Sequence, residues 1–413
     1  MGEGGFSLEE GGFDSGRTQR VNRQLLILTG IAFSTLFLFL IMSAASSAAT
    51  IHAHRGGPNL DGVATFGENS MSAFRNAAES GWVIEMDLDR TLDGVVVAIH
   101  DDTLDRTTDC EGEVSERTRE DLAGCRIDRI GIGDTRQNLP PGDPRLEPVP
   151  ELDSIIDLLK ETGATANVEV KNLGAGDFSF ASEVYAQLAE SGLPPGQVIV
   201  QNFIEGNLEQ APVLYPGAAT SYLTLNFLPP ELVVDTAVAA GYDWVSPQWP
   251  IDSQFVSRAR SAGLRIVPWT IDDSAGLLEA GRLGVDAVIT NDPALAERLI
   301  GPRPAISIRT VRPVVRTLPG RSVSLRLRVS NGGDAPSGAL SVSATFPARA
   351  LRSIGSARRT AGPVPSGGYR DLTFRFILRP SARPGSRYRV RFRLLGVESG
   401  GLIADSQIRV AAR

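Results

Sequence analysis

Histidine, lysine and cysteine are scarce in this chain of 413 residues. It has three histidines, two cysteines and only two lysines, Lys160 and Lys171. Two cysteines are too few for a metal site built on thiolates, which needs more ligands at closer spacing. All three histidines, His52, His54 and His100, lie in two short stretches near acidic residues. Because imidazole exchanges protons near neutral pH, these stretches predict acid/base chemistry.

Charge is distributed unequally between two parts of the chain. Residues 50–301 carry 17 basic and 40 acidic side chains, a net of −23, whereas residues 302–413 carry 21 arginines and four acids, a net of +17. The length predicts two or three domains. A charge difference of this size indicates two separate bodies, one on each side of residue 301.

An uncharged apolar run of 18 residues, Leu25–Met42, stands near the N-terminus. It is long enough to span a bilayer, and the three arginines before it would keep residues 1–24 in the cytoplasm. Two alternatives stay open for residues 25–45: a transmembrane anchor, or a signal segment that is cleaved at the small residues that follow. Both place the rest of the chain outside the cytoplasm.

The two cysteines, Cys110 and Cys125, fall in the exported part and bracket a polar stretch. Disulfides form and persist in oxidising compartments. We therefore predict one disulfide that closes this loop.

Short β-branched runs alternate with amphipathic segments from residue 51 to residue 300. Several of these segments end at a glycine of the kind that terminates helices, as at Gly81, Gly163, Gly241 and Gly263. This alternation predicts a TIM-type (β/α)8 barrel, an α/β fold, for residues 50–301. The predicted strands are Ile51–Arg55, Val83–Asp87, Val95–His100, Ala166–Lys171, Val198–Phe203, Thr220–Thr224, Asp243–Ser246, Arg265–Ile271 and Ala287–Asn291.

Nine strands are one more than such a barrel needs, and the extra strand follows a short turn. Only Leu92-Asp93-Gly94 separates Val83–Thr91 from Val95–His100, which predicts a hairpin and leaves no room for a crossover helix. If Asp93 and Gly94 form a two-residue turn, the paired residue numbers sum to 187. Asp87 would then face His100 across the hairpin.

Seven short motifs occur in an order that resembles the glycerophosphodiester phosphodiesterase family. The motifs are His54-Arg55-Gly56, Glu68-Asn69-Ser70, Glu85-x-Asp87, His100-Asp101 with Leu104-Asp105-Arg106-Thr107-Thr108, Glu169-x-Lys171, Trp269-Thr270 and Thr290-Asn291-Asp292-Pro293. The resemblance covers about residues 51–300. Two departures, Gly67 in place of proline and Gln201-Asn202-Phe203 in place of serine-phenylalanine, are expected to leave the acid/base and metal residues untouched.

The resemblance implies an enzyme that hydrolyses glycerophosphodiesters to glycerol 3-phosphate and an alcohol. It implies that Glu85, Asp87 and Glu169 bind one divalent cation. An all-oxygen ligand set suits Mg²⁺ or Ca²⁺ better than zinc. The remaining expected roles are general acid/base catalysis by His54 and His100, neutralisation of the phosphate by Arg55 and Lys171, and substrate binding by Asn69 and Trp269.

Some of these residues have structural alternatives. His52 lies two residues before His54 on the same strand face, so we expect it to fill the barrel interior. Trp269 is equally consistent with the core and with a wall for the glycerol group. Asp101–Thr108 is expected to brace a loop through Asp–Arg pairing.

Residues 302–413 show the strict alternation of apolar and polar residues that is typical of antiparallel strands, as in Ser322–Val329 and Arg387–Leu394. About seven such strands predict a sandwich that looks like the immunoglobulin-like modules of bacterial surface enzymes. Arg387, Arg389, Arg391 and Arg393 share one strand face. This stripe would bind an anionic cell-envelope polymer or lipid, or complement the acidic barrel. No nucleic-acid motif accompanies it.

Two alternative functions remain open from the sequence. A related exported phospholipase, of the phospholipase D or phosphatidylinositol-cleaving type, would share the barrel, the paired histidines and the cation, and would take lysophospholipids. A non-catalytic surface-binding protein would keep the sandwich and the N-terminal anchor, but it would not need the complete set of histidines, acids and lysine.

Overall fold

The computed structural model describes residues 48–171, 177–395 and 401–412. No helix in these ranges is long and apolar enough to cross a membrane. The predicted cytoplasmic lead, residues 1–24, and the predicted anchor or signal segment, residues 25–45, lie outside them.

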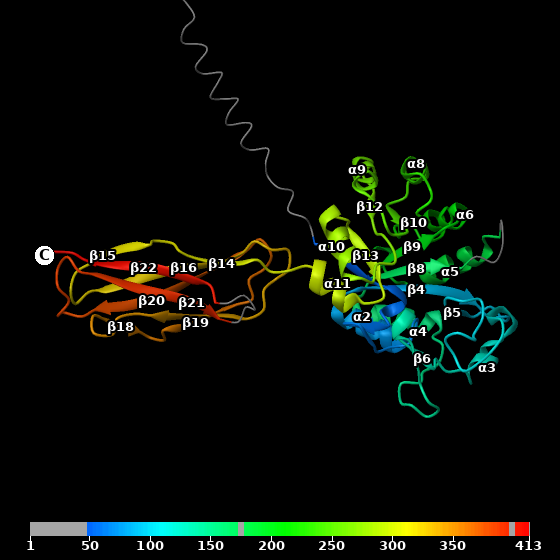
Figure 1. The fold of residues 1–413 in the computed structure, drawn as a ribbon, viewed down its shortest axis with the longest axis horizontal. Coiled ribbons are helices and arrows are strands. Elements are labelled where there is room, and N and C mark those ends of the chain that lie inside the picture. Colours follow the sequence, from blue (N-terminus) through cyan, green and yellow to red (C-terminus); the bar gives the residue numbers. More distant parts are fainter. Residues whose placement is uncertain (1–47, 172–176, 396–400, 413) are drawn as a thin grey trace, which may run out of the picture. The chain divides into compact units, whose positions relative to one another are not determined.

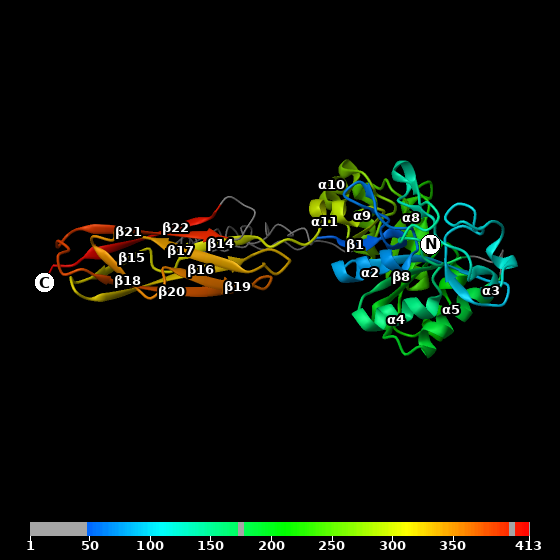
Figure 2. The ribbon, with the colours of Figure 1, turned by 90° about the horizontal axis from the view of Figure 1, so that it is seen from below.

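Eight parallel strands form a barrel, which confirms the predicted TIM-type fold (Figures 1 and 2). Their spatial order is β12-β11-β10-β9-β8-β4-β1-β13. Backbone hydrogen bonds of 3.0 Å from Asp286 N to Ile266 O and from Ile271 N to Ile289 O join the two ends of the sheet. The strands are β1 (Thr50–Ala53), β4 (Val83–Arg90), β8 (Ala166–Val170), β9 (Val198–Asn202), β10 (Ala219–Thr224), β11 (Trp244–Pro247), β12 (Arg265–Ile266) and β13 (Ala287–Thr290).

Amphipathic helices surround the strands and bury their apolar faces against them, as Phe74 and Val184 illustrate. The predicted terminators Gly81, Gly163 and Gly241 adopt the left-handed conformation directly after α2, α4 and α8. The longer helices are α2 (Met71–Ser80), α4 (Leu152–Thr162), α5 (Ser179–Glu190), α8 (Pro230–Ala240), α9 (Ser253–Ser261), α10 (Ser274–Leu283) and α11 (Pro293–Ile300). The short ones are η1 (His54–Gly56), η2 (Val114–Glu116), α3 (Arg119–Leu122), η3 (Gly133–Thr135), η4 (Pro195–Gln197), α6 (Glu205–Leu208) and α7 (Ala211–Leu214).

The predicted hairpin is present, but its predicted register is wrong by one residue. β5 (Val96–Ala98) pairs antiparallel with β4, and Leu88 lies opposite Ala98, so paired numbers sum to 186. The loop has three residues and not two, because Gly94 adopts a positive φ of 86° and Thr91 N donates to Val95 O. Asp87 O therefore accepts from the Ile99 amide, and Ile99, not His100, lies opposite Asp87.

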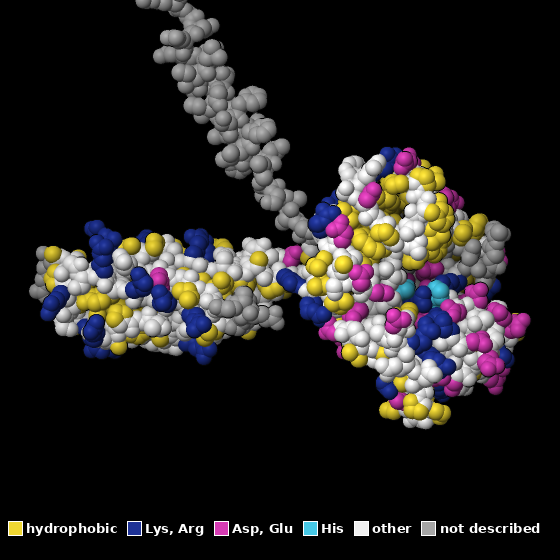
Figure 3. All heavy atoms as spheres, in the orientation of Figure 1, with side chains coloured by type: hydrophobic (Ala, Val, Ile, Leu, Met, Phe, Trp, Pro, Cys, Tyr) yellow, Lys and Arg dark blue, Asp and Glu magenta, His cyan; other side chains and the backbone are white. Residues whose placement is uncertain are grey.

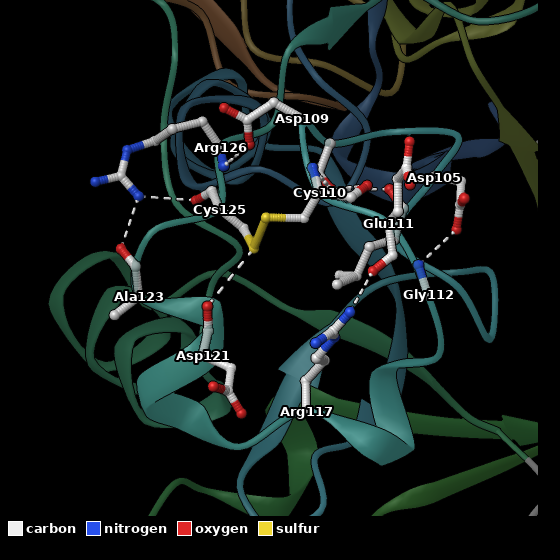
Figure 4. The surroundings of a disulfide bond; sticks show 12 residues. Asp105, Asp109, Cys110, Glu111, Gly112, Arg117, Asp121, Ala123, Cys125 and Arg126 are labelled. Carbon is white, nitrogen blue, oxygen red and sulfur yellow. Dashed lines mark hydrogen bonds between the residues drawn. A yellow bond between two sulfur atoms is a disulfide. The ribbon is translucent and has the colours of Figure 1, made fainter.

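The connection from β5 to α4 carries the predicted disulfide between Cys110 and Cys125, whose Cα atoms are 5.6 Å apart (Figure 4). Beneath it lies a small apolar cluster that includes Leu104, Val114 and Ile127. The cross-link and this cluster hold the segment that follows His100. Two short hairpins complete the barrel region: β2 (Asn59–Leu60) with β3 (Val63–Ala64), and β6 (Arg129–Ile130) with β7 (Gln137–Asn138).

The C-terminal region is entirely β-structure and forms two sheets, which confirms the predicted all-β class (Figure 2). The sheet orders are β14-β16-β20-β18 and β15-β22-β21-β17-β19. Residues 302–395 and 401–412 form nine strands where about seven were predicted: β14 (Ile306–Thr310), β15 (Val314–Thr317), β16 (Ser322–Asn331), β17 (Leu340–Thr345), β18 (Leu351–Ile354), β19 (Arg358–Gly362), β20 (Tyr369–Leu378), β21 (Arg387–Leu395) and β22 (Ile403–Val410). The likeness to immunoglobulin modules stays a prediction.

The arginine stripe of β21 lies on the outer face of its sheet. Val390, Phe392 and Leu394 are buried in the apolar core, while the four arginines that alternate with them are exposed. Asp405 on β22 pairs with Arg391 at 3.1 Å and with Arg389 at 3.7 Å. The alternation read from the sequence therefore matches the burial along this strand.

Candidate active site

A cavity of about 170 Å³ opens at the carboxyl ends of the barrel strands. Parallel barrels position their functional side chains at this end, because the loops that follow the strands meet there. In Figure 3 histidine side chains lie beside acidic and basic ones in a hollow on this part of the molecule. The cavity is lined by His54, Arg55, Glu85, Asp87, His100, Glu169, Lys171, Gln201, Phe203, Leu223, Trp269, Thr270 and Ile289.

Three carboxylates converge on one side of this cavity. Glu85 and Asp87 alternate along β4 and so point to the same face, and Asp87 is the register partner of Glu169 on β8. Each residue offers an oxygen that lies within 4.8 Å of the other two. Burial, followed by the charge of Asp87, raises the pKa of Glu169 to about 6 and that of Glu85 well above its usual value. Such mutual repulsion is relieved by a cation, and the all-carboxylate donor set fits Mg²⁺ or Ca²⁺.

Buried amides orient these carboxylates. Glu85 accepts from the Arg55 backbone N–H and from Gln201 Nε2, both at 2.8 Å. The prediction that the Gln201 segment leaves the metal residues untouched is therefore wrong. Asn69, which is buried, donates from Nδ2 to Asp87 Oδ2 at 3.0 Å and accepts from the Asp87 N–H at 3.3 Å. Asn69 does not line the cavity, so its geometry favours positioning of Asp87 over the predicted substrate contact.

His54 is held by the last strand of the barrel. Its Nδ1 lies 2.7 Å from Asn291 Oδ1, and Asn291 Nδ2 in turn donates to Asp272 Oδ2 at 2.6 Å. With Nδ1 bound to an acceptor, Nε2 is the nitrogen left for chemistry in the cavity. Burial, with a smaller contribution from the Arg55 charge, lowers the pKa of His54 to about 3. The imidazole is therefore neutral.

His100 is held by a carboxylate and not by an amide. Its Nδ1 lies 2.7 Å from Asp101 Oδ1, and Arg106 Nε donates to Asp101 Oδ2. Arg106 Nη1 also donates to Glu68 Oε2 at 2.6 Å, and Glu68 Oε1 accepts from Arg55 Nη1 at 2.8 Å. Asp101 pairs with Arg106 as predicted, and it also fixes the orientation of a cavity histidine.

Two cations face the carboxylates from the cavity wall. Lys171 Nζ lies 3.4 Å from Asp87 Oδ1 and 3.3 Å from Glu169 Oε1, and Arg55 Nε lies 3.3 Å from Asp87 Oδ2. Burial alone would raise the pKa of Asp87, but Lys171 and Arg55 outweigh it and hold this pKa well below its usual range. Asp87 therefore stays ionised, and the two cations line the space where a phosphate would enter.

The sequence profile of the glycerophosphoryl diester phosphodiesterase family matches residues 54–295, which include every residue of this cavity. The chain belongs to this family. Its members are phosphoric diester hydrolases, and the cavity described above is the candidate active site of this one.

Individual relatives match over the barrel region. A glycerophosphodiester phosphodiesterase of Bacillus altitudinis is 27% identical over 252 residues, 60% of this chain and 97% of that protein. One of Caldanaerobacter subterraneus is 26% identical over 238 residues, 56% of this chain and 92% of that protein. The crystal structure of a proposed glycerophosphoryl diester phosphodiesterase from Silicibacter pomeroyi superimposes with a TM-score of 0.53 at 21% identity, over 62% of this chain and 93% of that one, a likeness of fold.

Two aromatic side chains, Phe203 and Trp269, also line the cavity of this family member. Trp269 Nε1 donates to Ser246 O at 2.8 Å, and the ring of Phe203 packs edge-on against it with centroids 5.6 Å apart. Trp269 is thus fixed in place and lines the cavity. Of the two alternatives for this residue, core residue or wall for the glycerol group, its position favours the wall.

His52 lies outside the phosphodiesterase cavity, as predicted. It is 1% exposed, its Nδ1 is 3.3 Å from Asn167 Nδ2, and burial lowers its pKa to about 3. This histidine fills the barrel interior.

Sequence reasoning missed the residues that orient the site: Asn291 and Asp272 behind His54, Gln201 behind Glu85, and Glu68 between two arginines. Asn291, Gln201 and Glu68 lie in motifs or segments on which the family resemblance rests, and this was the available sign that they matter to the site. Asp272 lies in none of them. Their roles depend on contacts between distant parts of the chain.

Proposed function

We propose that this chain hydrolyses glycerophosphodiesters to glycerol 3-phosphate and an alcohol, with one Mg²⁺ or Ca²⁺ at Glu85, Asp87 and Glu169. The observation that carries the proposal is that two histidines, three convergent carboxylates and two cations line one cavity in a member of this family. A divalent cation would polarise a phosphoryl oxygen and lower the pKa of a bound hydroxyl.

We assign the two proton transfers of the reaction to the two cavity histidines. His54 is neutral and bound by an amide, so we assign it as the base that takes a proton from the attacking hydroxyl at Nε2. Burial lowers the pKa of His100, while the charge of Asp87 and the hydrogen bond to Asp101 oppose this shift, so we assign His100 as the partner that protonates the leaving alcohol oxygen. In related phosphodiesterases the attacking hydroxyl is the glycerol 2-OH, and water then opens the cyclic phosphate.

Arg55 and Lys171 would bind the phosphate. Both cations reach the carboxylate cluster at 3.3–3.4 Å, so both can neutralise phosphoryl oxygens that approach it. The Trp269 and Phe203 rings, which line the same cavity, would exclude water and pack against the glycerol carbons.

The purified full chain, assayed against a panel of glycerophosphodiesters with and without chelator, tests the proposal. We expect release of glycerol 3-phosphate that stops when the metal is removed. Release of a different phosphate product, or undiminished release without metal, would overturn it.

We also propose that the enzyme works outside the cytoplasm, anchored by residues 25–45 or released after their cleavage. The Cys110–Cys125 disulfide supports an oxidising compartment. The exposed β21 arginines, of which two share Asp405, suit an anionic envelope polymer or the acidic barrel. The complete set of cavity residues argues against a non-catalytic binding protein.

A further inference from the structure

The two C-terminal sheets end in three connections that lie side by side. Leu378, the last residue of β20, donates its N–H to Arg321 O in the β15–β16 connection at 3.0 Å. Arg379, the first residue of the β20–β21 connection, donates its N–H to Ala350 O in the β17–β18 connection at 2.9 Å. These hydrogen bonds join the three connections into one end of the region, on the left in Figure 1.

Arginines concentrate at this end of the sheets, where Figure 3 shows basic side chains. Arg316 on β15, Arg409 on β22 and Arg387 on β21 form a row across three neighbouring strands, since Arg409 is the register partner of both others. Further arginines come from the three connections. We call the whole set the basic tip: Arg316, Arg321, Arg349, Arg379, Arg383, Arg387 and Arg409.

The basic tip is not neutralised by carboxylates among the residues that the structure describes. The described acids of this region are bound by groups outside the tip: Asp334 by the Arg303 amide, Asp371 by Arg328, and Asp405 by Arg389 and Arg391. The tip therefore differs from the middle of β21, where Asp405 compensates two arginines.

The row of three arginines is costly when no anion is bound. Adjacent strands lie about 4.8 Å apart, and like charges directly opposite one another destabilise a sheet. The middle residue, Arg409, has an Nε that is shielded from solvent and has no hydrogen-bond partner among the described residues. Such an unpaired N–H adds a second cost. A phosphate oxygen drawn between these guanidinium groups would relieve both.

An exposed apolar side chain accompanies the charge. Leu318 in the β15–β16 connection is 37% exposed, and its carbonyl accepts from Arg321 N at 3.2 Å, which keeps it beside the tip. An exposed leucine contributes little to binding a soluble polyanion, but it can enter the interface of a bilayer. Adjacent connections also present their arginines to a flat surface together, whereas a linear polymer that follows β21 would meet Asp405.

We propose that the basic tip docks the protein on a bilayer that contains anionic phospholipids. The arginines bind the lipid phosphates, and Leu318 enters the interface between them. This contact goes beyond the proposed function and does not depend on it, because none of its residues lies in the barrel.

A fluorescent probe at the tip of the full chain gives the first test. Cys110 and Cys125 are joined in a disulfide, so Leu318→Cys supplies a single thiol for an environment-sensitive label. Its emission should shift to the blue with vesicles of phosphatidylglycerol and phosphatidylcholine, and stay unchanged with phosphatidylcholine alone. Ala339→Cys, exposed just before β17 at the opposite end of the strands, is the matched control and should shift with neither.

The predicted N-terminal anchor cannot produce this difference. An apolar anchor would bind both kinds of vesicle, whereas the probe reports only whether the tip touches lipid. Equal shifts with the two kinds of vesicle, or no shift with either, would overturn the proposal.

Charge reversal in the probe-labelled chain gives the second test. Each basic side chain near an anionic bilayer contributes roughly fivefold to binding, so Arg321→Glu with Arg383→Glu should lower the binding constant read from the probe by about 25-fold or more. Arg309→Glu with Arg370→Glu, at exposed strand positions outside the tip, changes the net charge equally. This control should change the binding constant little, because charges more than about 8 Å from the lipid are screened at physiological ionic strength.

The remaining outcomes are distinguishable. Equal losses in the two double variants would show that net charge and not the tip is responsible, and would overturn the proposal. Soluble polyphosphate that releases the tip at a phosphate concentration below that of the accessible lipid would assign the tip to a soluble polyanion and also overturn it. Release of glycerol 3-phosphate is measured separately, so none of these results decides the proposed function.

Discussion

The barrel and the C-terminal sheets bury different kinds of side chain. The barrel encloses Glu85, Asp87 and His52, each about 1% exposed. The core of the C-terminal sheets is aromatic and aliphatic, as in Phe374 and Phe392. Buried polar groups cost free energy unless they are paired. The buried polar side chains of the barrel therefore lower its folding stability, whereas the buried apolar side chains of the sheets raise theirs. The comparison indicates that chemistry belongs to the barrel, while the distinctive feature of the sheets, their arginines, is on the surface.

Removal of metal should have the largest effect, and this effect should be on the catalytic activity of the barrel. We expect chelation with EDTA to abolish turnover, because three carboxylates then repel one another in a buried site. Mg²⁺ or Ca²⁺ should restore it, and Glu85→Gln should need more metal for the same rate. Steady-state assays over a metal titration check this, and full activity after exhaustive dialysis against chelator would contradict it.

Loss of either cavity histidine should rank next. His54→Ala and His100→Ala should each lower kcat by about 10² to 10⁴, as expected for positioned acid/base groups. Their melting temperatures should stay close to that of the wild type, since neither side chain belongs to an apolar core cluster. Near-native kinetics in either variant would show that the assignment is wrong.

A pair of buried asparagines compares the two regions directly. Asn69 in the barrel binds Asp87, and Asn331 in the sheets accepts from Ala305 N at 3.0 Å and donates to Ala335 O at 2.7 Å. Asn69→Ala should reduce metal affinity by about 10- to 100-fold, as loss of a residue behind a metal ligand commonly does. Asn331→Ala should lower thermal stability and leave metal affinity unchanged. Metal titration and calorimetry on both variants would separate these effects, and equal metal affinities would refute the role of Asn69.

A truncation in the sheet core should change stability alone. Phe392 is fully buried and packs against Phe374 with ring centroids 4.9 Å apart. Phe392→Ala should cost about 3–5 kcal/mol in unfolding free energy of the sheets. Denaturant unfolding monitors the loss, and turnover measured below the new transition should match the wild type. A large drop in turnover there would couple the sheets to the chemistry.

His52 should give the smallest effect, and one that depends on pH. The pKa of His52 is about 3 in the folded chain and 6.5 in the unfolded chain, where the imidazole is solvated. Between these two pH values only the unfolded chain binds a proton at this residue. Stability from the neutral imidazole is complete above pH 6.5 and declines as the pH falls, by about 2 kcal/mol at pH 5. His52→Gln should make the melting temperature less sensitive to pH across this range. An identical pH dependence in both proteins would contradict the burial argument.

Strands, helices and the principal cavity residues could be predicted because their signals are local. Alternation marked β4 and β21, and glycines marked the ends of helices such as α2. The hairpin between β4 and β5 was also local, yet its register failed because Gly94 made the turn one residue longer. Small differences in turn geometry decide which residues face one another.

The supporting contacts of the site could not be derived in the same way. Asn291 is 237 positions from His54, and Gln201 is 116 positions from Glu85. Barrel closure brings these pairs together, and no spacing rule in the sequence encodes it. For Asn69 the motif was recognised, but its role became visible only when both ends of its amide were found on Asp87.

The central claim is that Glu85, Asp87 and Glu169 together hold one divalent cation beside His54 and His100. Anomalous diffraction from crystals of the protein grown with Mn²⁺ tests it most directly. We predict a single strong peak in the catalytic cavity within coordination distance of all three carboxylates. A cavity without such a peak at saturating Mn²⁺, or a peak bound by other residues, would contradict the account.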